Sequence, residues 1–144
     1  MKIAALIAAL TLAACADSPE PVRGDLATFD GEWGPSMHCT AAAGTRCDRP
    51  WGLVAVRAKV DRAVLTWLDG TNPATVGPTL ATHRGDVLDG CLSVPAGLDG
   101  DLAHDAYDLC PVDGATPREI RGEIVWGRGT VGECHCDTTL REQP

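Results

Sequence analysis

Apolar and polar residues alternate most clearly in two segments near the end of the chain. Ile120, Ile124 and Trp126 alternate with polar or small residues, and residues 127–129 then provide a glycine-rich turn. The segment after this turn alternates again, and the residues on its apolar face are Cys134, Cys136, Thr138 and Leu140. Successive side chains of a strand point to opposite faces, so this pattern predicts an antiparallel hairpin with one buried and one solvated face.

The longest apolar segment outside the amino-terminal region, residues 53–68, fits two patterns. Val56, Ala58 and Val60 alternate with charged residues, and a turn at Asp61–Arg62 would let the chain return as a second strand. A spacing of three to four residues also places an apolar stripe along a helix. The valines and the β-like pattern downstream favour two strands, with the helix as the alternative.

Turn-forming pairs divide the later part of the chain at intervals typical of an all-β domain. These pairs are Asp69–Gly70, Gly77–Pro78, Asp89–Gly90, Asp99–Gly100 and Asp113–Gly114. We therefore predict a mainly β fold, a small antiparallel barrel or sandwich stapled by disulfides. It would form a single domain over residues 29–144.

The amino-terminal region has a different pattern, an uninterrupted apolar run from Ile3 to Ala14 after the single charge of Lys2. As a helix the run would reach ~18 Å, at ~1.5 Å per residue, whereas the hydrocarbon core of a bilayer is ~30 Å thick. A positive start, a short apolar stretch and small residues before a cleavage site are typical of a secretory signal peptide, here residues 1–14.

The run ends in Leu12–Ala13–Ala14–Cys15, which resembles the lipobox of bacterial lipoproteins. The resemblance implies that Cys15 is lipidated, that the preceding peptide is removed, and that the protein is anchored to a membrane of the cell envelope. Ala16 follows this cysteine, which by resemblance to Gram-negative sorting rules implies the outer membrane, on its periplasmic face or at the surface. Residues 15–28 then form the lipidated end and a flexible tether.

Six further cysteines follow Cys15, an even number that suits disulfides in an exported domain. They are Cys39, Cys47, Cys91, Cys110, Cys134 and Cys136. Cys134 and Cys136 are two residues apart, too far along a strand and with unsuitable side-chain directions for a bond to each other. We therefore expect them to have separate partners, and a remaining local bridge would join Cys91 to Cys110 or Cys39 to Cys47.

The charge of the chain limits its partners. Asp and Glu number 20 against 12 Lys and Arg, a net charge of −8 that becomes more negative once Lys2 leaves with the signal peptide. This balance excludes nucleic acid as a partner, because binding to phosphate backbones depends on Lys and Arg. It also indicates that attachment to an anionic leaflet depends on the lipid rather than on the domain.

Soft metal ligands occur in two short clusters. We predict that their cysteines form disulfides and that no cofactor is bound, since exported thiols are normally bridged. The alternative is a copper or zinc site. Its ligands would come from His38, Cys39, Cys134, His135 and Cys136.

Other candidate chemistry is sparse. An acidic stretch can gather around calcium through Asp99, Asp101, Asp105 and Asp108. It lacks the glycine and closing glutamate of an EF-hand, so we expect a solvated loop. His83 and His104 have no identifiable partner and are expected on the surface.

Serine and tryptophan residues change this picture little. None of the three serines, Ser18, Ser36 and Ser93, lies in a Gly-x-Ser-x-Gly motif, so a serine nucleophile is not expected. The four tryptophans are expected in the core, with a ligand groove as the alternative. They are Trp33, Trp51, Trp67 and Trp126.

Two classes of function follow from these patterns. The first is a non-enzymatic envelope lipoprotein that binds an envelope protein or a small ligand, or has a structural role. In general properties it is similar to small lipid-anchored inhibitors of basic enzymes such as lysozyme. The second is a metal-handling protein or a small hydrolase.

Overall fold

A computed structural model describes residues 25–47, 50–51, 55–72 and 74–144. Within them the chain forms one short 3₁₀ turn and eleven strands. The turn is η1 (Leu26–Thr28) and the strands are β1 (Gly31–Ala41), β2 (Val56–Asp61), β3 (Val64–Asp69), β4 (Thr79–Arg84), β5 (Asp86–Leu88), β6 (Cys91–Val94), β7 (Gly97–Asp99), β8 (Leu102–His104), β9 (Tyr107–Pro111), β10 (Glu119–Trp126) and β11 (Cys134–Glu142). The mainly β fold predicted from the alternation is confirmed.

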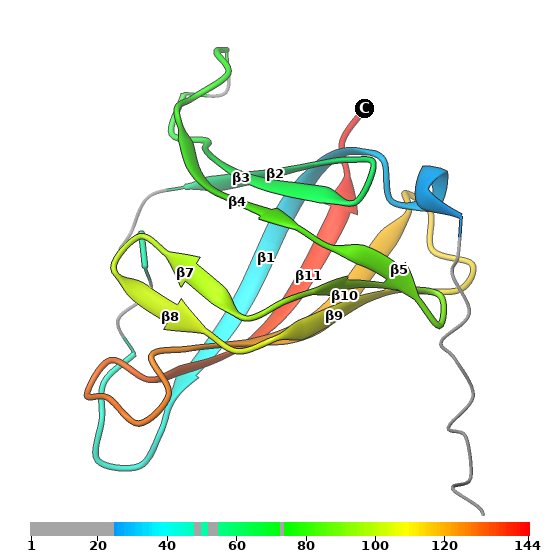
Figure 1. Cartoon of the computed structure of the whole chain (residues 1–144). Helices are drawn as coiled ribbons and strands as arrows, with labels where there is room; N and C mark the ends of the chain where they lie inside the picture. The colour runs from blue at the N-terminus through cyan, green and yellow to red at the C-terminus, as the bar shows by residue number, and fades with distance from the viewer. Residues whose placement is uncertain (1–24, 48–49, 52–54, 73) are drawn as a thin grey trace, which may run out of the picture.

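The strands form one antiparallel sheet that curls into a nearly closed barrel (Figure 1). Its order is β4-β3-β2-β1-β11-β10-β9-β6-β5, and β7 and β8 form a side hairpin joined to β10 through β8. The two end strands, β4 and β5, follow each other in the chain and are separated by Gly85 alone. The chain therefore passes directly from one end of the sheet to the other, which brings the two ends together.

Gly85 makes this passage possible because two other segments approach its backbone closely. Its N–H donates to the carbonyl of Ala63 over 2.8 Å. A Cβ at this position would lie 2.5 Å from the carbonyl oxygen of Ser93 on β6. Only a residue without a side chain fits between these carbonyls unless the backbone shifts.

The segment over residues 53–68 is a hairpin in its described part, so the strand prediction is confirmed there and the helical alternative is wrong. β2 and β3 pair from Val56↔Asp69 to Asp61↔Val64. The turn is centred on Arg62 and Ala63, one residue later than predicted, and both have positive φ, 48° and 60°. This conformation matches the twist of a two-residue hairpin, and the Arg62 N–H is held by Asp30 Oδ1 at 2.8 Å.

The carboxyl-terminal hairpin is also confirmed. β10 and β11 pair antiparallel from Glu119↔Arg141 to Trp126↔Cys134. The residues predicted to face inward on β11, from Cys134 to Leu140, are buried and alternate with more exposed ones. β11 also pairs along β1 from Trp33↔Glu142 to Ala41↔Cys134, so it lies between two long partners.

The inward faces of the strands fill the barrel with aliphatic and aromatic side chains. Trp33, Trp67 and Trp126 have no exposed surface. Trp51, which is half-buried, packs against Trp67 and Trp126 with ring centroids 5.4 and 5.9 Å apart. The tryptophans therefore belong to the core, as expected, rather than to a ligand groove.

The turn η1 precedes the barrel and is attached to its wall. Asp25 caps it by accepting from the Ala27 N–H at 2.9 Å, and Arg118 Nη1 donates to the Thr28 carbonyl at 2.8 Å. The folded part therefore begins before Phe29. Residues 1–24, which include Cys15 and most of the expected tether, lie outside the described residues.

Candidate functional site

Two histidines and one aspartate form a buried polar cluster at the side hairpin. His83 lies on β4, Asp99 ends β7 and His104 ends β8, and their exposed fractions are 8%, 0% and 3%. One ring nitrogen of each histidine and one carboxylate oxygen of Asp99 lie within 4.8 Å of one another. Polar groups this deeply buried require partners, so their hydrogen bonds determine what the cluster can do.

The sequence of the side hairpin explains why these residues point inward. β7 and β8 pair as Gly97↔His104, Leu98↔Ala103 and Asp99↔Leu102, around a turn in which Gly100 has a φ of 60°. Leu98 and Ala103 are exposed, so the other residue pairs of the hairpin face the barrel. β7 also packs against β4, which carries His83.

Asp99 is satisfied at both carboxylate oxygens. Its Oδ1 lies 2.5 Å from His83 Nε2, and its Oδ2 accepts from the Trp126 indole N–H at 2.6 Å. A carboxylate can only accept, so His83 carries a proton on Nε2. The carboxylate thus fixes the orientation of the His83 imidazole and the Trp126 indole from inside the barrel.

His104 has one satisfied and one unsatisfied ring nitrogen. Its Nδ1 lies 2.8 Å from the carbonyl oxygen of Asp105, which can only accept, so the proton is on Nδ1. Its Nε2 is buried and has no hydrogen-bond partner among the residues that the structure describes. The ring meets His83 edge-on at a centroid distance of 4.6 Å and contacts Tyr107 at 5.3 Å.

Tyr107 borders the cluster as a neutral group. It is 5% exposed, and burial, together with the nearby negative charge of Asp99, raises the pKa of its hydroxyl. The phenol therefore keeps its proton at physiological pH and supplies no negative charge to the cluster.

The prediction that His83 and His104 lie on the surface is wrong. The prediction of a solvated acidic loop is also wrong for Asp99, which is buried. The hairpin folds over the barrel and turns Asp99 and His104 inward, where His83 from a distant strand meets them. A usable signal was present, since Gly97, Asp99, Leu102 and His104 share one face of a hairpin around Asp99–Gly100. The partner strand β4 could not be inferred from that pattern.

The acidic stretch does not gather around a common point. Asp105 pairs with Arg128 Nε at 2.5 Å, and Asp108 accepts from the Ser93 hydroxyl at 2.5 Å. Asp99 faces the core instead.

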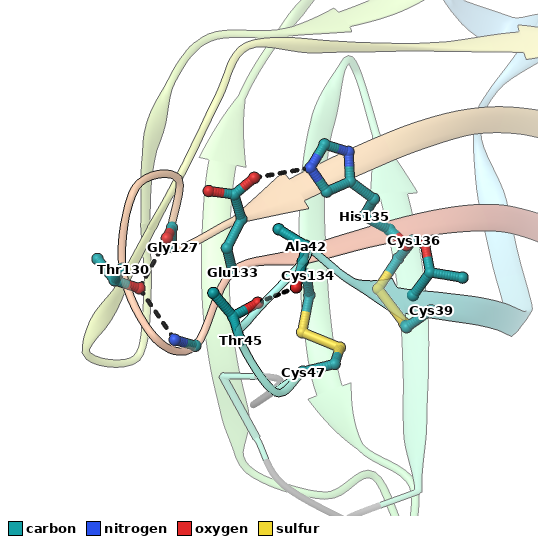
Figure 2. The surroundings of a disulfide bond; sticks show 12 residues. Cys39, Ala42, Thr45, Cys47, Gly127, Thr130, Glu133, Cys134, His135 and Cys136 are labelled. Carbon is teal, nitrogen blue, oxygen red and sulfur yellow. Dashed lines mark hydrogen bonds and ion pairs between the residues drawn. A yellow bond between two sulfur atoms is a disulfide. The ribbon is translucent and has the colours of Figure 1, made fainter.

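All six cysteines in the described residues form disulfides. The pairs are Cys39–Cys136, Cys47–Cys134 and Cys91–Cys110. Cys134 and Cys136 have separate partners, as predicted, and the local bridge is the predicted one between Cys91 and Cys110. Figure 2 shows the first two bridges side by side, joining β1 and the segment after it to β11.

These bridges leave no thiolates for the alternative copper or zinc site. His38 is exposed on β1. His135 points away from the bridges towards Glu133, whose Oε1 lies 2.8 Å from its Nε2 (Figure 2). Its Nδ1 lies 3.1 Å from Glu123 Oε1. Hydrogen bonds to both glutamates raise the pKa of His135.

Comparison of the chain with models of protein families, with curated proteins and with solved structures gave no match. Within the described residues there is no helix with the length and apolarity needed to cross a bilayer.

Proposed function

We propose that this protein is a lipid-anchored domain of the cell envelope with a non-enzymatic binding or structural role. The observation that carries the proposal is the use of the cysteines. The chain has seven, and six of them pair within the barrel. The seventh, Cys15, is the one that stands in the lipobox-like sequence.

The disulfides support an oxidising compartment outside the cytoplasm. Three bridges in one small domain are typical of exported proteins and rare where thiols are kept reduced. The lipobox-like sequence supports the same compartment independently, and Ala16 after Cys15 favours the outer membrane.

The charge supports anchoring by lipid alone. The net charge of the whole chain is −8, and the domain without Lys2 is more negative still, so it has no attraction for an anionic leaflet. A diacylglyceryl group with a further acyl chain provides stable attachment, at ~0.8 kcal/mol per buried methylene. The partners we propose are therefore the membrane, through the lipid, and another envelope protein or a small ligand, but not nucleic acid.

The burial of the polar cluster supports a role without catalysis. His83, Asp99 and His104 are each at least nine-tenths buried, so a substrate in solution does not reach them in this conformation. Ser93 donates its hydroxyl proton to Asp108 rather than to a histidine, which is not the arrangement of an activated nucleophile.

The test of anchoring is the substitution Cys15→Ser. Cells expressing the unchanged protein should incorporate radioactive palmitate into it and retain it in the membrane fraction. Cys15→Ser should remove the label and release the protein to the soluble fraction, because serine provides no thiol for the lipid.

Ser18→Ala, three residues further on, is the matched control and should leave both label and fractionation unchanged. Unchanged membrane retention of Cys15→Ser would overturn the proposal.

A further inference from the structure

The two buried histidines present a ring nitrogen each to the same small space beside Gly97. A Cβ on Gly97 would lie 3.0 Å from His104 Nε2 and 3.5 Å from His83 Nδ1. The φ of Gly97 is not in the left-handed region, so its backbone does not require glycine. The absence of a side chain instead keeps a carbon atom from pressing against His104 Nε2 and from touching His83 Nδ1.

The hydrogen bonds of the two rings determine which nitrogens carry lone pairs. His83 Nε2 is protonated towards Asp99, and His104 Nδ1 is protonated towards the Asp105 carbonyl. In the neutral rings the lone pairs therefore lie on His83 Nδ1 and His104 Nε2. These are the two nitrogens that border Gly97, and His104 Nε2 is buried without a hydrogen-bond partner in the described part of the chain.

The positions of these protons and lone pairs match those of histidines that bind a metal ion. Metal-ligating histidines commonly donate their other ring N–H to a carboxylate or a backbone carbonyl, which fixes the tautomer and the ring orientation. Asp99 provides the carboxylate for His83, and the Asp105 carbonyl does the same for His104.

We propose that His83 and His104 bind one divalent transition-metal ion of the zinc class beside Gly97, with Asp99 as the residue that positions His83. Imidazole nitrogens suit zinc, copper and nickel, whereas calcium and magnesium require oxygen ligands. Asp99 uses both oxygens for His83 and Trp126, so it acts through the ring rather than as a ligand. This site goes beyond the anchoring role and does not depend on it.

Zinc chloride is the probe for the first experiment. The full chain, oxidised and stripped with a chelator, is titrated by calorimetry. We expect one ion per chain, with binding lost in His104→Gln and weakened by about 10- to 100-fold in Asp99→Asn, the range seen when an outer partner of a ligating histidine is removed.

Gly97→Ala keeps both ligands but places a methyl group against them, and it should also weaken binding. His135→Gln is the matched control because this partly exposed histidine lies between Glu133 and Glu123, where zinc could bind at the surface. It should leave the affinity unchanged.

A second measurement requires no variant, in case His104→Gln does not fold. In the unchanged protein, ¹⁵N chemical shifts should show unprotonated His104 Nε2 and His83 Nδ1 before zinc is added. Zinc should shift these two signals and leave those of His135 in place.

Three outcomes would overturn the proposal. They are no stoichiometric zinc binding, loss of binding in His135→Gln but not in His104→Gln, and zinc-induced shifts confined to His135. The cluster would then be a purely structural part of the core.

Discussion

His104 and His135 show how the face of a strand decides what a histidine does. His135 lies on the outer face of β11, beside two glutamates, and it is partly exposed. His104 lies on the inner face of β8 and is 3% exposed, and its Nε2 has no hydrogen-bond partner within residues 25–47, 50–51, 55–72 and 74–144. The first is a surface group that titrates against neighbouring charges, and the second is a candidate ligand.

The pKa of His135 should lie above its ordinary value of 6.5 in the folded protein, because Glu133 and Glu123 bind its protonated ring. The stabilisation that results is fully present below the unfolded-state pKa and is lost as the pH rises through the raised value. An NMR titration of the ring protons measures this pKa.

Glu133→Gln should lower the pKa of His135 more than Glu123→Gln, since Glu133 makes the larger contribution. Equal titration of His135 in the unchanged protein and in Glu133→Gln would show that this ion pair does not form in solution.

The pair β4 and β5 acts as a single bent strand that closes the barrel. β4 pairs with β3 at one end of the sheet, and β5 pairs with β6 at the other. Gly85 stands at the bend, between the carbonyls of Ala63 and Ser93. The closure of the sheet thus depends on how closely backbone can approach backbone at one residue.

Gly85→Ala should lower the free energy of unfolding by about 1–3 kcal/mol, the usual cost of forcing extra atoms into a packed site. Its Cβ meets a backbone oxygen that cannot move without separating β5 from β6. Urea unfolding followed by tryptophan fluorescence measures the loss.

Gly34→Ala on β1 is the control for this substitution. A Cβ there would lie 2.5 Å from Gln143 Nε2, the end of an exposed side chain that can rotate away. We expect little change in stability. A similar loss in both variants would mean that Gly85 is not the point at which closure is constrained.

The two bridges to β11 are nested, and this connectivity governs how the chain as a whole is stabilised. Cys39–Cys136 and Cys47–Cys134 span 97 and 87 residues and share most of the enclosed chain. While either remains, the long loop stays closed, and the other closes only a small ring of about ten residues. On the loop-entropy model, closing such a ring adds roughly 2.7 kcal/mol to the free energy of unfolding. Closing the long loop adds about 4.6 kcal/mol more.

Replacing each bridge by a pair of alanines lowers the free energy of unfolding. Replacing both bridges together should lower it by about 2 kcal/mol more than the sum of the losses when each bridge is replaced alone. Denaturant unfolding of the four members of this cycle measures the difference. Trimethylamine N-oxide in all samples keeps the weakest variant folded.

A second cycle, between Cys39–Cys136 and Cys91–Cys110, is the control. The Cys91–Cys110 bridge encloses its own 19-residue loop whether or not the longer bridge is present, so the two losses should add within about 0.5 kcal/mol. Additive losses in both cycles would show that the bridges do not act through a shared loop.

Much of the fold could be predicted from the sequence because strand patterns are local. The alternation over 120–126 and 134–140 predicted the hairpin of β10 and β11, since a period of two places every second side chain on the core. Over residues 53–68 the periodicity alone did not decide between a helix and two strands. The pairing of β2 with β3 determined that the described part of this segment is a hairpin. The separate partners of Cys134 and Cys136 also followed locally, from their distance along one strand.

By itself, then, the sequence determined three things. They are the mainly β content, the separate disulfide partners of Cys134 and Cys136, and the lipobox-like sequence that ends at Cys15. Only the tertiary structure decided which strands close the barrel, which cysteines bond and where His83, Asp99 and His104 meet. The last point depends on β4 and the β7–β8 hairpin, segments that come together only when the sheet curls. A local sequence pattern does not show which residues will be neighbours across a barrel, because the packing of segments distant in the sequence determines those neighbours.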